Sequence, residues 1–258
     1  MSEQLASLAT TVAEQAGDLL LDYAGTLLTV DTKSSGTDPV SQADRAAEAL
    51  LVRQLTAARP HDGLLGEEGA DREGTTGLRW VVDPLDGTVN YLYGLPGWSV
   101  SVACEQRAAH GWEAVAAAVH HAPAGETYRA WRGGGAWLGE LALQANEPVA
   151  LDQALVATGF GYRAEVRARQ AAVVGALLPR VRDIRRIGSA ALDLCMVAAG
   201  RVDAYYEDSS SRWDWAAGAL IAAEAGALVT PLPAPEGGAG VLAAGPSLHP
   251  VLRAAVGG

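Results

Sequence analysis

The chain has 258 residues, which is enough for one large domain or two smaller lobes with a sizeable core. Apolar residues make up 49% of it and charged residues 19%, a composition that is typical of a globular protein and excludes a disordered one. The net charge of −11 argues against direct binding to nucleic acid or to an anionic membrane. It leaves phosphate substrates open, because bound metal ions can supply positive charge locally.

Cysteine usage and the N-terminal sequence predict a cytoplasmic protein. Cys104 and Cys195 lack C-x-x-C spacing and lie in apolar surroundings, so we expect buried free thiols in a reducing compartment. No basic residue precedes Lys33, which argues against a secretory signal peptide. No apolar run is long enough to span a bilayer, and no membrane partner is expected.

The first sixty residues predict two helices joined by a polar loop. Apolar residues recur at steps of three and four over residues 2–28, which indicates an amphipathic helix. Ser41 is a candidate N-cap for a second helix that ends near Arg59. The loop carries Lys33, the only lysine among 19 basic residues. Lys33 is a candidate for placing a compact charge near a metal or phosphate, and the alternative is a solvated loop residue.

Two short strands are expected next, and each ends in an acidic turn. Leu64-Leu65 predicts a strand that leads into the turn at Glu67. The apolar run Trp80–Asp83 predicts a second, buried strand. Pro84 has no amide hydrogen and favours extended geometry in the residue before it, so we expect this strand to end with Asp83 at its tip.

Two carboxylates share the turn that follows this second strand. Asp83 is followed three residues later by Asp86 and the turn-forming Gly87, and the Leu85 carbonyl lies between the two acids. Oxygen ligands this close together suit a hard divalent cation such as Mg²⁺. The amides of Gly87 and Thr88 can face an anion beside that cation. The alternative is an ordinary surface turn.

Strands and helices alternate along the rest of the chain, which predicts a mixed α/β class. Trp98–Glu105 alternates like a half-buried strand. Further strands are expected at Trp112–His120, Glu126–Trp131, Ala154–Gly159, Asp183–Ile187, Val202–Glu207 and Val241–Ala244, and further helices at Ala164–Arg182, Ala190–Ala199, Ala216–Ala225 and the C-terminus. The adjacent His120 and His121 fall on opposite faces of a strand, so we interpret both as structural.

Four acids, each at a turn or at the end of an element, are candidates for one site: Glu67, Asp83, Asp86 and Asp214. Asp214 alone needs no metal, because it can serve as a plain N-cap of the apolar helix that follows it. Four converging carboxylates without cations would repel one another, whereas two or three Mg²⁺ ions would turn them into a cage. A two-metal cage predicts in-line displacement at phosphorus by an activated water.

With these motifs in order, the chain resembles the inositol monophosphatase family, which are metal-dependent, lithium-sensitive phosphomonoesterases. The resemblance covers nearly the whole chain. The motifs that carry it are Lys33-Ser34-Ser35 with Asp38 to Asp44, Gly66-Glu67-Glu68, Asp83-Pro84-Leu85-Asp86-Gly87-Thr88, Gly188-Ser189-Ala190 and Trp213-Asp214-Trp215-Ala216-Ala217-Gly218. The resemblance implies an alternating α-β-α-β-α sandwich, usually dimeric. Because the sequence changes character near residue 140, we expect residues 1–140 to hold most of the metal site and residues 141–258 to close it, within one compact unit.

The resemblance also implies a role for each matching position. One Mg²⁺ would be held by Glu67, Asp83 and the Leu85 carbonyl, and a second by Asp83, Asp86 and Asp214. The attacking water would be oriented by Glu67 and Thr88, with Asp44 supporting Thr88. The phosphate would bind to the amides of Gly87 and Thr88, and the remaining substrate contacts would come from Gly188, Ser189, Ala190, Glu207 and Asp214.

The expected activity is Mg²⁺-dependent hydrolysis of myo-inositol 1-phosphate, or a similar small polyol or sugar phosphate, by a homodimer. Histidinol phosphate, fructose 1,6-bisphosphate and 3′-phosphoadenosine phosphates are alternative substrates for the same mechanism. A non-catalytic partner of the transcription machinery is an alternative of another class, because some bacterial relatives take that role.

The segment Asp208–Arg212 departs from the family pattern, which usually carries glycine and apolar residues there. In the family this segment borders the leaving group of the substrate. Arg212 offers a planar cation with five donors, and we expect it to point inward and to favour substrates with a second anionic group. The alternative is an outward Arg212 that pairs with a surface acid.

Overall fold

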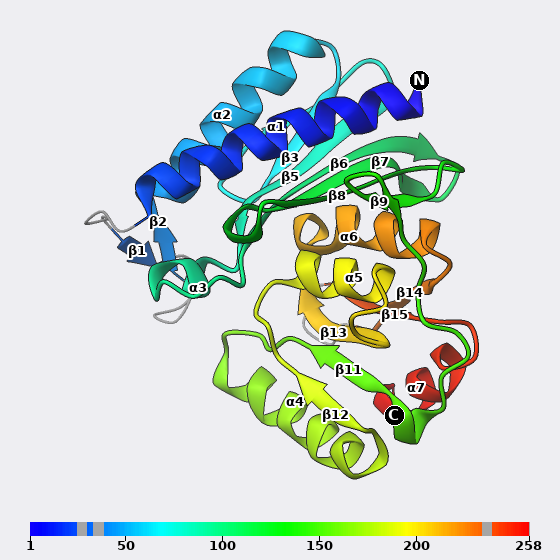
Figure 1. Ribbon diagram of the computed structural model, residues 1–258. Coiled ribbons are helices and arrows are strands. Elements are labelled where there is room, and N and C mark those ends of the chain that lie inside the picture. The colour runs from blue at the N-terminus through cyan, green and yellow to red at the C-terminus, as the bar shows by residue number, and fades with distance from the viewer. Residues whose placement is uncertain (25–29, 33–38, 234–238, 258) are drawn as a thin grey trace.

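The computed structural model describes residues 1–24, 30–32, 39–233 and 239–257, and its elements stack in alternating layers of helix and sheet (Figure 1). The outer layer at the N-terminal end consists of α1 (Ser2–Tyr23) and α2 (Gln42–Ala58). Both helices are amphipathic, and their apolar faces pack on the first sheet with Leu20 and Leu51 fully buried. Five layers follow one another in this way, which confirms the predicted α-β-α-β-α sandwich.

The first sheet has eight strands in the order β10-β9-β8-β7-β6-β5-β3-β4. β3 and β5 pair in parallel, and the other neighbours are antiparallel. The strands are β3 (Gly63–Gly66), β4 (Asp71–Arg72), β5 (Leu78–Asp86), β6 (Ser99–Ala108), β7 (Gly111–His121), β8 (Glu126–Trp131), β9 (Ala136–Leu138) and β10 (Leu141–Ala142). The short helix α3 (Thr88–Leu92) follows β5 after Gly87 and begins with the candidate site residue Thr88.

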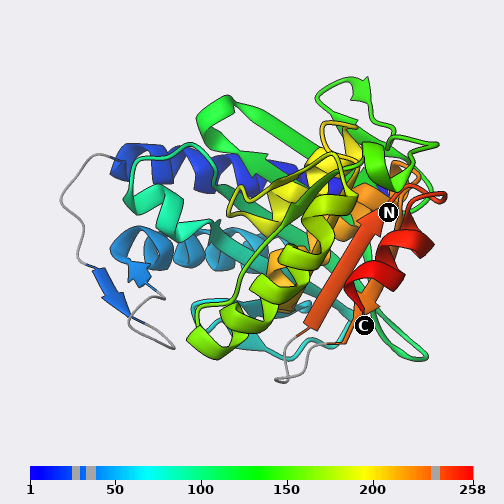
Figure 2. The ribbon, with the colours of Figure 1, turned by 90° about the horizontal axis from the view of Figure 1, so that it is seen from below.

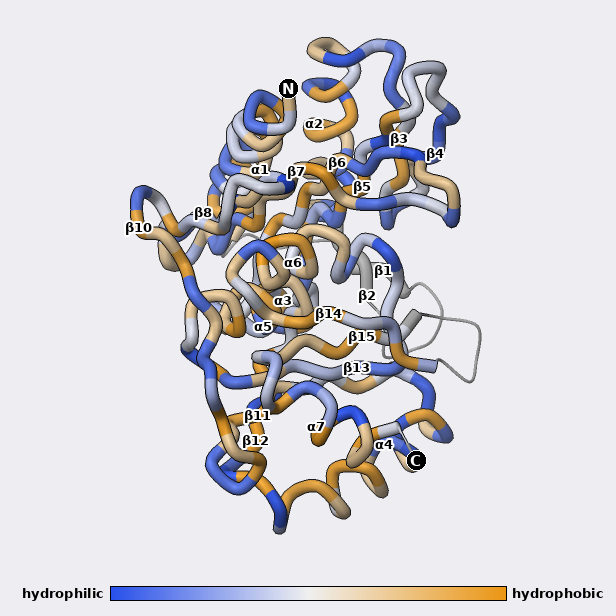
Figure 3. The backbone as a smooth tube through the Cα atoms, turned by 90° about the vertical axis from the view of Figure 1, so that its right-hand side faces the viewer, coloured by the Kyte–Doolittle hydropathy of each residue, from blue (hydrophilic) through white to orange (hydrophobic). Residues whose placement is uncertain are grey.

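Helices α5 (Ala190–Ala198) and α6 (Arg212–Glu224) form the middle layer between the two sheets. They are covered on both sides, which is why their sequences are almost wholly apolar and are coloured toward the hydrophobic end in Figure 3. A Cβ added at Gly218 would lie 2.7 Å from Leu194, so glycine is needed where the two helices touch. The N-terminal ends of both helices are thereby fixed beside β5 and β6.

The second sheet has five strands in the order β12-β11-β13-β15-β14. The strands are β11 (Leu155–Thr158), β12 (Asp183–Arg185), β13 (Ala204–Ser210), β14 (Leu228–Leu232) and β15 (Ala239–Ala244), and β11 pairs in parallel with both of its neighbours. Helices α4 (Ala164–Leu177) and α7 (His249–Val256) lie on its outer side (Figure 2). A separate two-stranded pair, β1 (Val30–Thr32) and β2 (Pro39–Ser41), precedes α2.

The strand that was expected to end at Asp83 continues to Asp86 as part of β5. Its ladder with β6 is interrupted after Asp83 and resumes where Asp86 lies opposite Ser99. Pro84 cannot donate a ladder hydrogen bond, which accounts for the interruption. β5 continues past Pro84 because β6 runs alongside and pairs with it again at Asp86. Proline therefore interrupts the ladder without ending the strand.

Other predictions for single elements also need correction. β6 is buried on both faces over its first seven residues and is not half-buried, because α5 and α6 cover the face that was expected to meet solvent. Helix α6 begins at Arg212 and not at Ala216. Residues 208–210, expected as loop, belong to β13, and the sequence did not predict β9, β10 or β14.

The predicted structural roles of the histidines and cysteines agree with the fold. The Nδ1 atom of His120 lies 2.9 Å from the Thr127 hydroxyl, while Nε2 of His121 lies 2.8 Å from the Pro96 carbonyl. Cys104 and Cys195 are free and buried, as predicted. Within the described ranges, no helix combines the length and the apolar content that crossing a membrane requires.

Candidate active site

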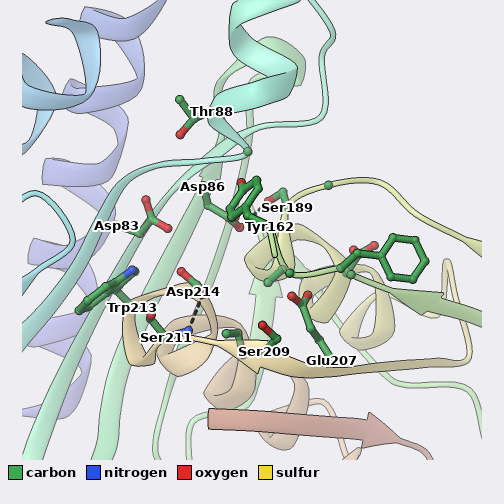
Figure 4. A pocket seen from close by; sticks show the side chains of 18 of the residues that line it. Asp83, Asp86, Thr88, Tyr162, Ser189, Glu207, Ser209, Ser211, Trp213 and Asp214 are labelled. Atoms are coloured by element: carbon green, nitrogen blue, oxygen red, sulfur yellow. Dashed lines mark hydrogen bonds between the residues drawn. The ribbon is translucent and has the colours of Figure 1, made fainter. Parts of the chain in front are cut away.

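A cavity of about 510 Å³ lies where the end of β5, the first turns of α5 and α6 and the end of β13 meet. Figure 4 shows Asp83, Asp86 and Asp214 directed toward one space, with Glu207 across from them. The predicted residues that line the cavity are Glu67, Asp83, Leu85, Asp86, Gly87, Thr88, Gly188, Ser189, Ala190, Glu207 and Asp214. Residues more than 140 positions apart in the sequence therefore meet at one site.

Three candidate residues do not line this cavity. Asp44 is fully buried behind it on α2 and contacts the lining residue Thr88. Arg212 starts α6 but is absent from the cavity wall. Lys33 falls outside the described residues.

The break in β5 places the first two aspartates. The Asp83 carboxylate accepts a hydrogen bond of 2.9 Å from the Leu85 amide, which closes the turn. The Asp86 side chain reaches from β5 to the first turn of α5. There its Oδ2 accepts hydrogen bonds from the Ser189 hydroxyl at 2.6 Å and from the Ala191 amide at 2.7 Å. Asp86 thus binds free amides at the start of α5, where the helix dipole favours a negative charge.

Thr88 and Asp44 make the contact that was expected of them. The Thr88 hydroxyl lies 3.1 Å from Asp44 Oδ1 and 3.1 Å from the Leu85 carbonyl, and it can donate its one proton to either. With that proton engaged, the lone pairs of the hydroxyl oxygen are left as acceptors toward the cavity. Gly87, which precedes it, has φ of 95°, and an added Cβ would lie 2.7 Å from the Gly97 carbonyl, so only glycine fits this turn.

Glu67 is positioned by a residue that the sequence reasoning missed. Glu48 on α2 accepts hydrogen bonds from the amides of Glu68 at 2.8 Å and Ala70 at 3.1 Å, which fixes the turn that carries Glu67. A Cβ at Gly66 would lie 2.4 Å from Glu48 Oε2, so the glycine before Glu67 allows the close approach. The available signal was that Glu48 lies four residues after Asp44, on the same helix face.

Asp214 is not the N-cap of α6, as the sequence suggested, but the third residue of the helix. Ser211 is the N-cap, and the two form a capping box in which Asp214 Oδ2 accepts from the Ser211 amide at 2.6 Å (Figure 4). The helix begins earlier than expected because the Ser-x-x-Asp spacing satisfies its free amides. The other oxygen of Asp214 remains available on the side that faces Asp83.

Burial and mutual repulsion perturb the acids at this end of the cavity. Burial, followed by the negative charges of Glu67, Asp86 and Asp214, raises the pKa of Asp83 well above its usual range. Burial also raises the pKa of Asp214 strongly and that of Asp86 to about 6, although the bonds from Ser189 and Ala191 oppose the latter shift. A hard cation would relieve this repulsion, and the donor set of carboxylate and carbonyl oxygens fits Mg²⁺.

The four acids line one cavity without forming a tight cluster. Across the described part of the chain, no three Asp, Glu, His or Cys side chains converge tightly enough to bind one metal together. The fit of the site to a metal rests on its oxygen donors and on the raised pKa values of the aspartates.

The opposite wall of the cavity is built from β13 and α5. Glu207 accepts a hydrogen bond of 2.7 Å from the Tyr205 hydroxyl, and burial raises the pKa of Glu207 to about 7. An added Cβ at Gly159 would overlap the Glu207 carboxylate, so this glycine gives it room. Asp193 on α5 is 1% exposed, and its Oδ1 atom has no hydrogen-bond partner among the described residues. Burial raises its pKa, which favours a neutral carboxyl facing the cavity.

Comparisons with known proteins identify the family. The model of the inositol monophosphatase family matches residues 1–255. The chain belongs to this family. It is 49% identical over 238 residues to the inositol-1-monophosphatase SuhB of Mycobacterium tuberculosis, covering 88% of this chain and 81% of the relative. It is 37% identical over 227 residues to the Nus factor SuhB of Escherichia coli K12, covering 87% and 84%.

A solved structure agrees with the same assignment. The crystal structure of the extragenic suppressor protein suhB from Bartonella henselae superposes with a TM-score of 0.89 at 34% identity, covering 98% of both chains. The resemblance inferred from the motifs is therefore confirmed for this member of the inositol monophosphatase family.

The prediction that Arg212 points inward to the cavity is wrong. Its Nε donates to Glu105 Oε1 at 2.6 Å, and its guanidinium lies 4.0 Å from the centre of the Trp215 ring. Glu105 is 0% exposed, so the partner is a buried acid and not the surface acid of the alternative. The prediction failed because a buried carboxylate 107 residues away, invisible to local pattern, attracts the side chain.

Proposed function

We propose that this inositol monophosphatase family member is a Mg²⁺-dependent phosphomonoesterase that acts on myo-inositol 1-phosphate or a similar small polyol phosphate. The observation that carries the proposal is the gathering of Glu67, Asp83, Asp86 and Asp214 on one cavity wall, where burial and repulsion raise the pKa values of the aspartates. A site of this kind is costly without cations and suited to two or three of them.

Each element of the site has a chemical task in this proposal. Mg²⁺ would be held by the four acids and the Leu85 carbonyl, and when bound it would supply a Lewis acid and lower the pKa of a water. Glu67 and Thr88 orient that water, and Asp44 holds the Thr88 hydroxyl so that its lone pairs face the cavity. The phosphate would bind to the amides of Gly87 and Thr88, which stand at the start of α3.

The alcohol part of the substrate is assigned to the opposite wall. Glu207 accepts from substrate hydroxyls, and the buried Asp193 behind it offers a carboxyl oxygen without a partner among the described residues. Gly188, Ser189 and Ala190 line the space between the phosphate end and this end. A wall of hydrogen-bonding acids favours a polyol over an apolar alcohol.

Two alternatives stay within reach of experiment. Histidinol phosphate, fructose 1,6-bisphosphate and 3′-phosphoadenosine phosphates would use the same acids with another leaving group. A role beside the transcription machinery is suggested by relatives such as the E. coli Nus factor SuhB. The complete set of carboxylates favours catalysis for this chain. The homodimer, lithium inhibition and the two-lobe division at residue 140 stay predictions.

A phosphate-release assay tests the proposal directly. The purified protein is incubated with inositol 1-phosphate, histidinol phosphate, fructose 1,6-bisphosphate and 3′-phosphoadenosine 5′-phosphate, each with Mg²⁺ or with EDTA. We expect the highest kcat/KM on inositol 1-phosphate, loss of activity in EDTA, and inhibition by Li⁺ at high Mg²⁺. Release that is unaffected by EDTA, or no release from any of the four, would contradict the proposal.

A further inference from the structure

One face of β6 carries a row of buried polar side chains that the proposed mechanism does not use. Ser99, Ser101 and Glu105 alternate along the strand and are 0%, 1% and 0% exposed. Between them Ala103 packs against α5 and α6, so this face points into the middle layer. Polar groups in such a layer are costly unless they are bonded, and all three are bonded.

Their partners are the first turns of the two middle helices. The Ser99 hydroxyl lies 3.3 Å from the hydroxyl of Ser189, the N-cap of α5. The Ser101 hydroxyl donates to the Trp213 carbonyl at 3.2 Å, and Glu105 accepts from Arg212. The row therefore attaches β6 to the ends of α5 and α6 that border the cavity.

Glu105 is the strongest of these attachments. Arg79 on β5 donates to its Oε2 from Nε at 2.8 Å, and Arg212 donates to its Oε1 from Nε at 2.6 Å. The Arg212 guanidinium also lies 4.0 Å from the Trp215 ring centre and donates to the Trp112 carbonyl at 3.3 Å. These contacts fix the planar guanidinium in one orientation.

Arg212 is the first residue of α6, and Asp214 is the third. The residue between them, Trp213, is held through its carbonyl by Ser101. Since a helical turn is a rigid unit, fixing these two residues also fixes where the Asp214 carboxylate lies relative to Asp83 and Asp86. A buried ion pair such as Arg212–Glu105 contributes little net stability, because the cost of desolvating both charges offsets their attraction. Its position two residues before Asp214 therefore indicates a role other than stabilising the fold.

We propose that Glu105 and Arg212 form a positioning pair that holds the first turn of α6 against β6 and thereby places Asp214 for Mg²⁺. The inference rests on the proposed metal site. Neither residue touches the substrate or the reacting atoms, so both act through Asp214. Polar groups behind a ligand commonly set metal affinity in this way.

The test compares two substitutions that remove a cation from the same carboxylate. Arg212→Gln breaks the connection to α6, while Arg79→Gln removes the cation on β5 and leaves α6 attached. In either variant one arginine still neutralises Glu105, so neither leaves a buried charge without a partner. Mg²⁺ affinity is measured by titration calorimetry and by the Mg²⁺-induced rise in Tm, neither of which depends on turnover.

We expect Arg212→Gln to raise the Kd for Mg²⁺ about tenfold, the lower end of the range for residues behind a metal ligand, while Arg79→Gln changes it less than about twofold. Saturating Mg²⁺ should restore kcat in Arg212→Gln, with KM for the substrate unchanged. Arg212→Lys, which keeps the charge but not the planar fork, should fall between the wild type and Arg212→Gln.

The outcomes separate this inference from the proposed function. If the wild type binds no Mg²⁺, the proposed function fails and the inference with it. If the wild type binds Mg²⁺ but Arg212→Gln and Arg79→Gln have equal Kd values, the positioning pair is wrong and the metal site stands. Should Arg212→Gln lose its far-UV circular dichroism signal, Arg212→Lys and Ser101→Ala carry the comparison, and unchanged Kd values in both would overturn the inference.

Discussion

β5 and β13 approach the cavity from opposite sides, and each breaks its ladder there. In β5 the register shifts between Asp83 and Asp86, and in β13 it shifts between Glu207 and Ser210. Both shifts turn acidic side chains toward the cavity. The two walls of the site therefore share one structural feature, a register shift near the end of the strand.

The charges on the two walls are compensated differently. On β13, Asp208 forms an ion pair with Arg169 and accepts from the Gln170 side chain at 2.7 Å. Within the described residues, neither Asp83 nor Asp214 has a cationic partner, and the pKa values of both are raised. The proposed Mg²⁺ would compensate the charges of the β5 wall, whereas the chain itself supplies the cation for Asp208 on the β13 wall.

The largest difference between the two walls is expected in activity, when one aspartate on each wall is replaced by asparagine. Asp83→Asn removes a proposed Mg²⁺ ligand, and we expect kcat/KM to fall about a thousandfold or more, as several kcal/mol of transition-state stabilisation are lost. Asp208→Asn, whose partner is Arg169, should cost less than about tenfold. Steady-state phosphate release at saturating Mg²⁺ measures both. Wild-type turnover in Asp83→Asn would rule out the cage.

The charge repulsion among the acids of the β5 wall should be measurable as a change in Tm when Mg²⁺ is added or removed. At a Mg²⁺ concentration of a hundred times Kd, binding adds about 2.7 kcal/mol, which corresponds to a rise in Tm of about 5–10 °C for a chain of this size. Asp83→Asn should abolish this rise. In EDTA, however, the variant should melt at or above the wild-type Tm, because one repelling charge is gone. A lower Tm in EDTA would show that the repulsion does not limit stability.

The comparison also shows what could be predicted from sequence. The β5 wall is encoded locally, since proline, glycine and two aspartates within six residues mark both the turn and its chemistry. The end of β13 was predicted as loop because Asp208-Ser209-Ser210 has low strand propensity. It becomes a strand through pairing with β15 and through bonds from Arg169 and Gln170, which lie nearly forty residues away.

The same distinction explains the side chains. The four predicted metal ligands, Glu67, Asp83, Asp86 and Asp214, all line the cavity, because each stands in a turn that ends a strand or in the first turn of a helix. Glu48, Asp193 and Glu105 have no turn signal and gain their roles only when distant elements pack together. Arg212 was placed wrongly for this reason, since nothing near it in sequence announces Glu105.

Acidity should affect the β13 wall through Glu207. Burial raises its pKa from 4.5 to about 7 in the fold, so the folded state binds a proton that the unfolded state releases earlier. Its contribution to stability is therefore complete below about pH 4.5 and is lost as the pH rises through about 7. In EDTA, Glu207→Gln should reduce the fall in Tm between pH 5 and 8. A pH profile of Tm that is identical in both proteins would contradict the shift.

The smallest expected effect concerns substrates with a second anionic group. With Arg212 turned away, three arginines in the described part of the chain line the cavity. Arg163 pairs with Glu165 and Arg169 with Asp208. Arg186 is exposed, forms no ion pair within the described residues and lies 6.0 Å from the Phe160 ring. We expect Arg186→Ala to lower kcat/KM for fructose 1,6-bisphosphate at most about fivefold, since exposed ion pairs contribute about 0.2–1 kcal/mol, with inositol 1-phosphate unaffected.

Arg185→Ala is the matched control for Arg186, because Arg185 is the exposed neighbour that pairs with Asp183 at 2.6 Å and does not line the cavity. It should leave all substrates unchanged. Because Arg186 would repel the amine of histidinol phosphate, Arg186→Ala should also raise activity on that substrate slightly. Equal losses on the mono- and bisphosphate, or equal effects of the two substitutions, would mean that Arg186 does not recognise a second anionic group.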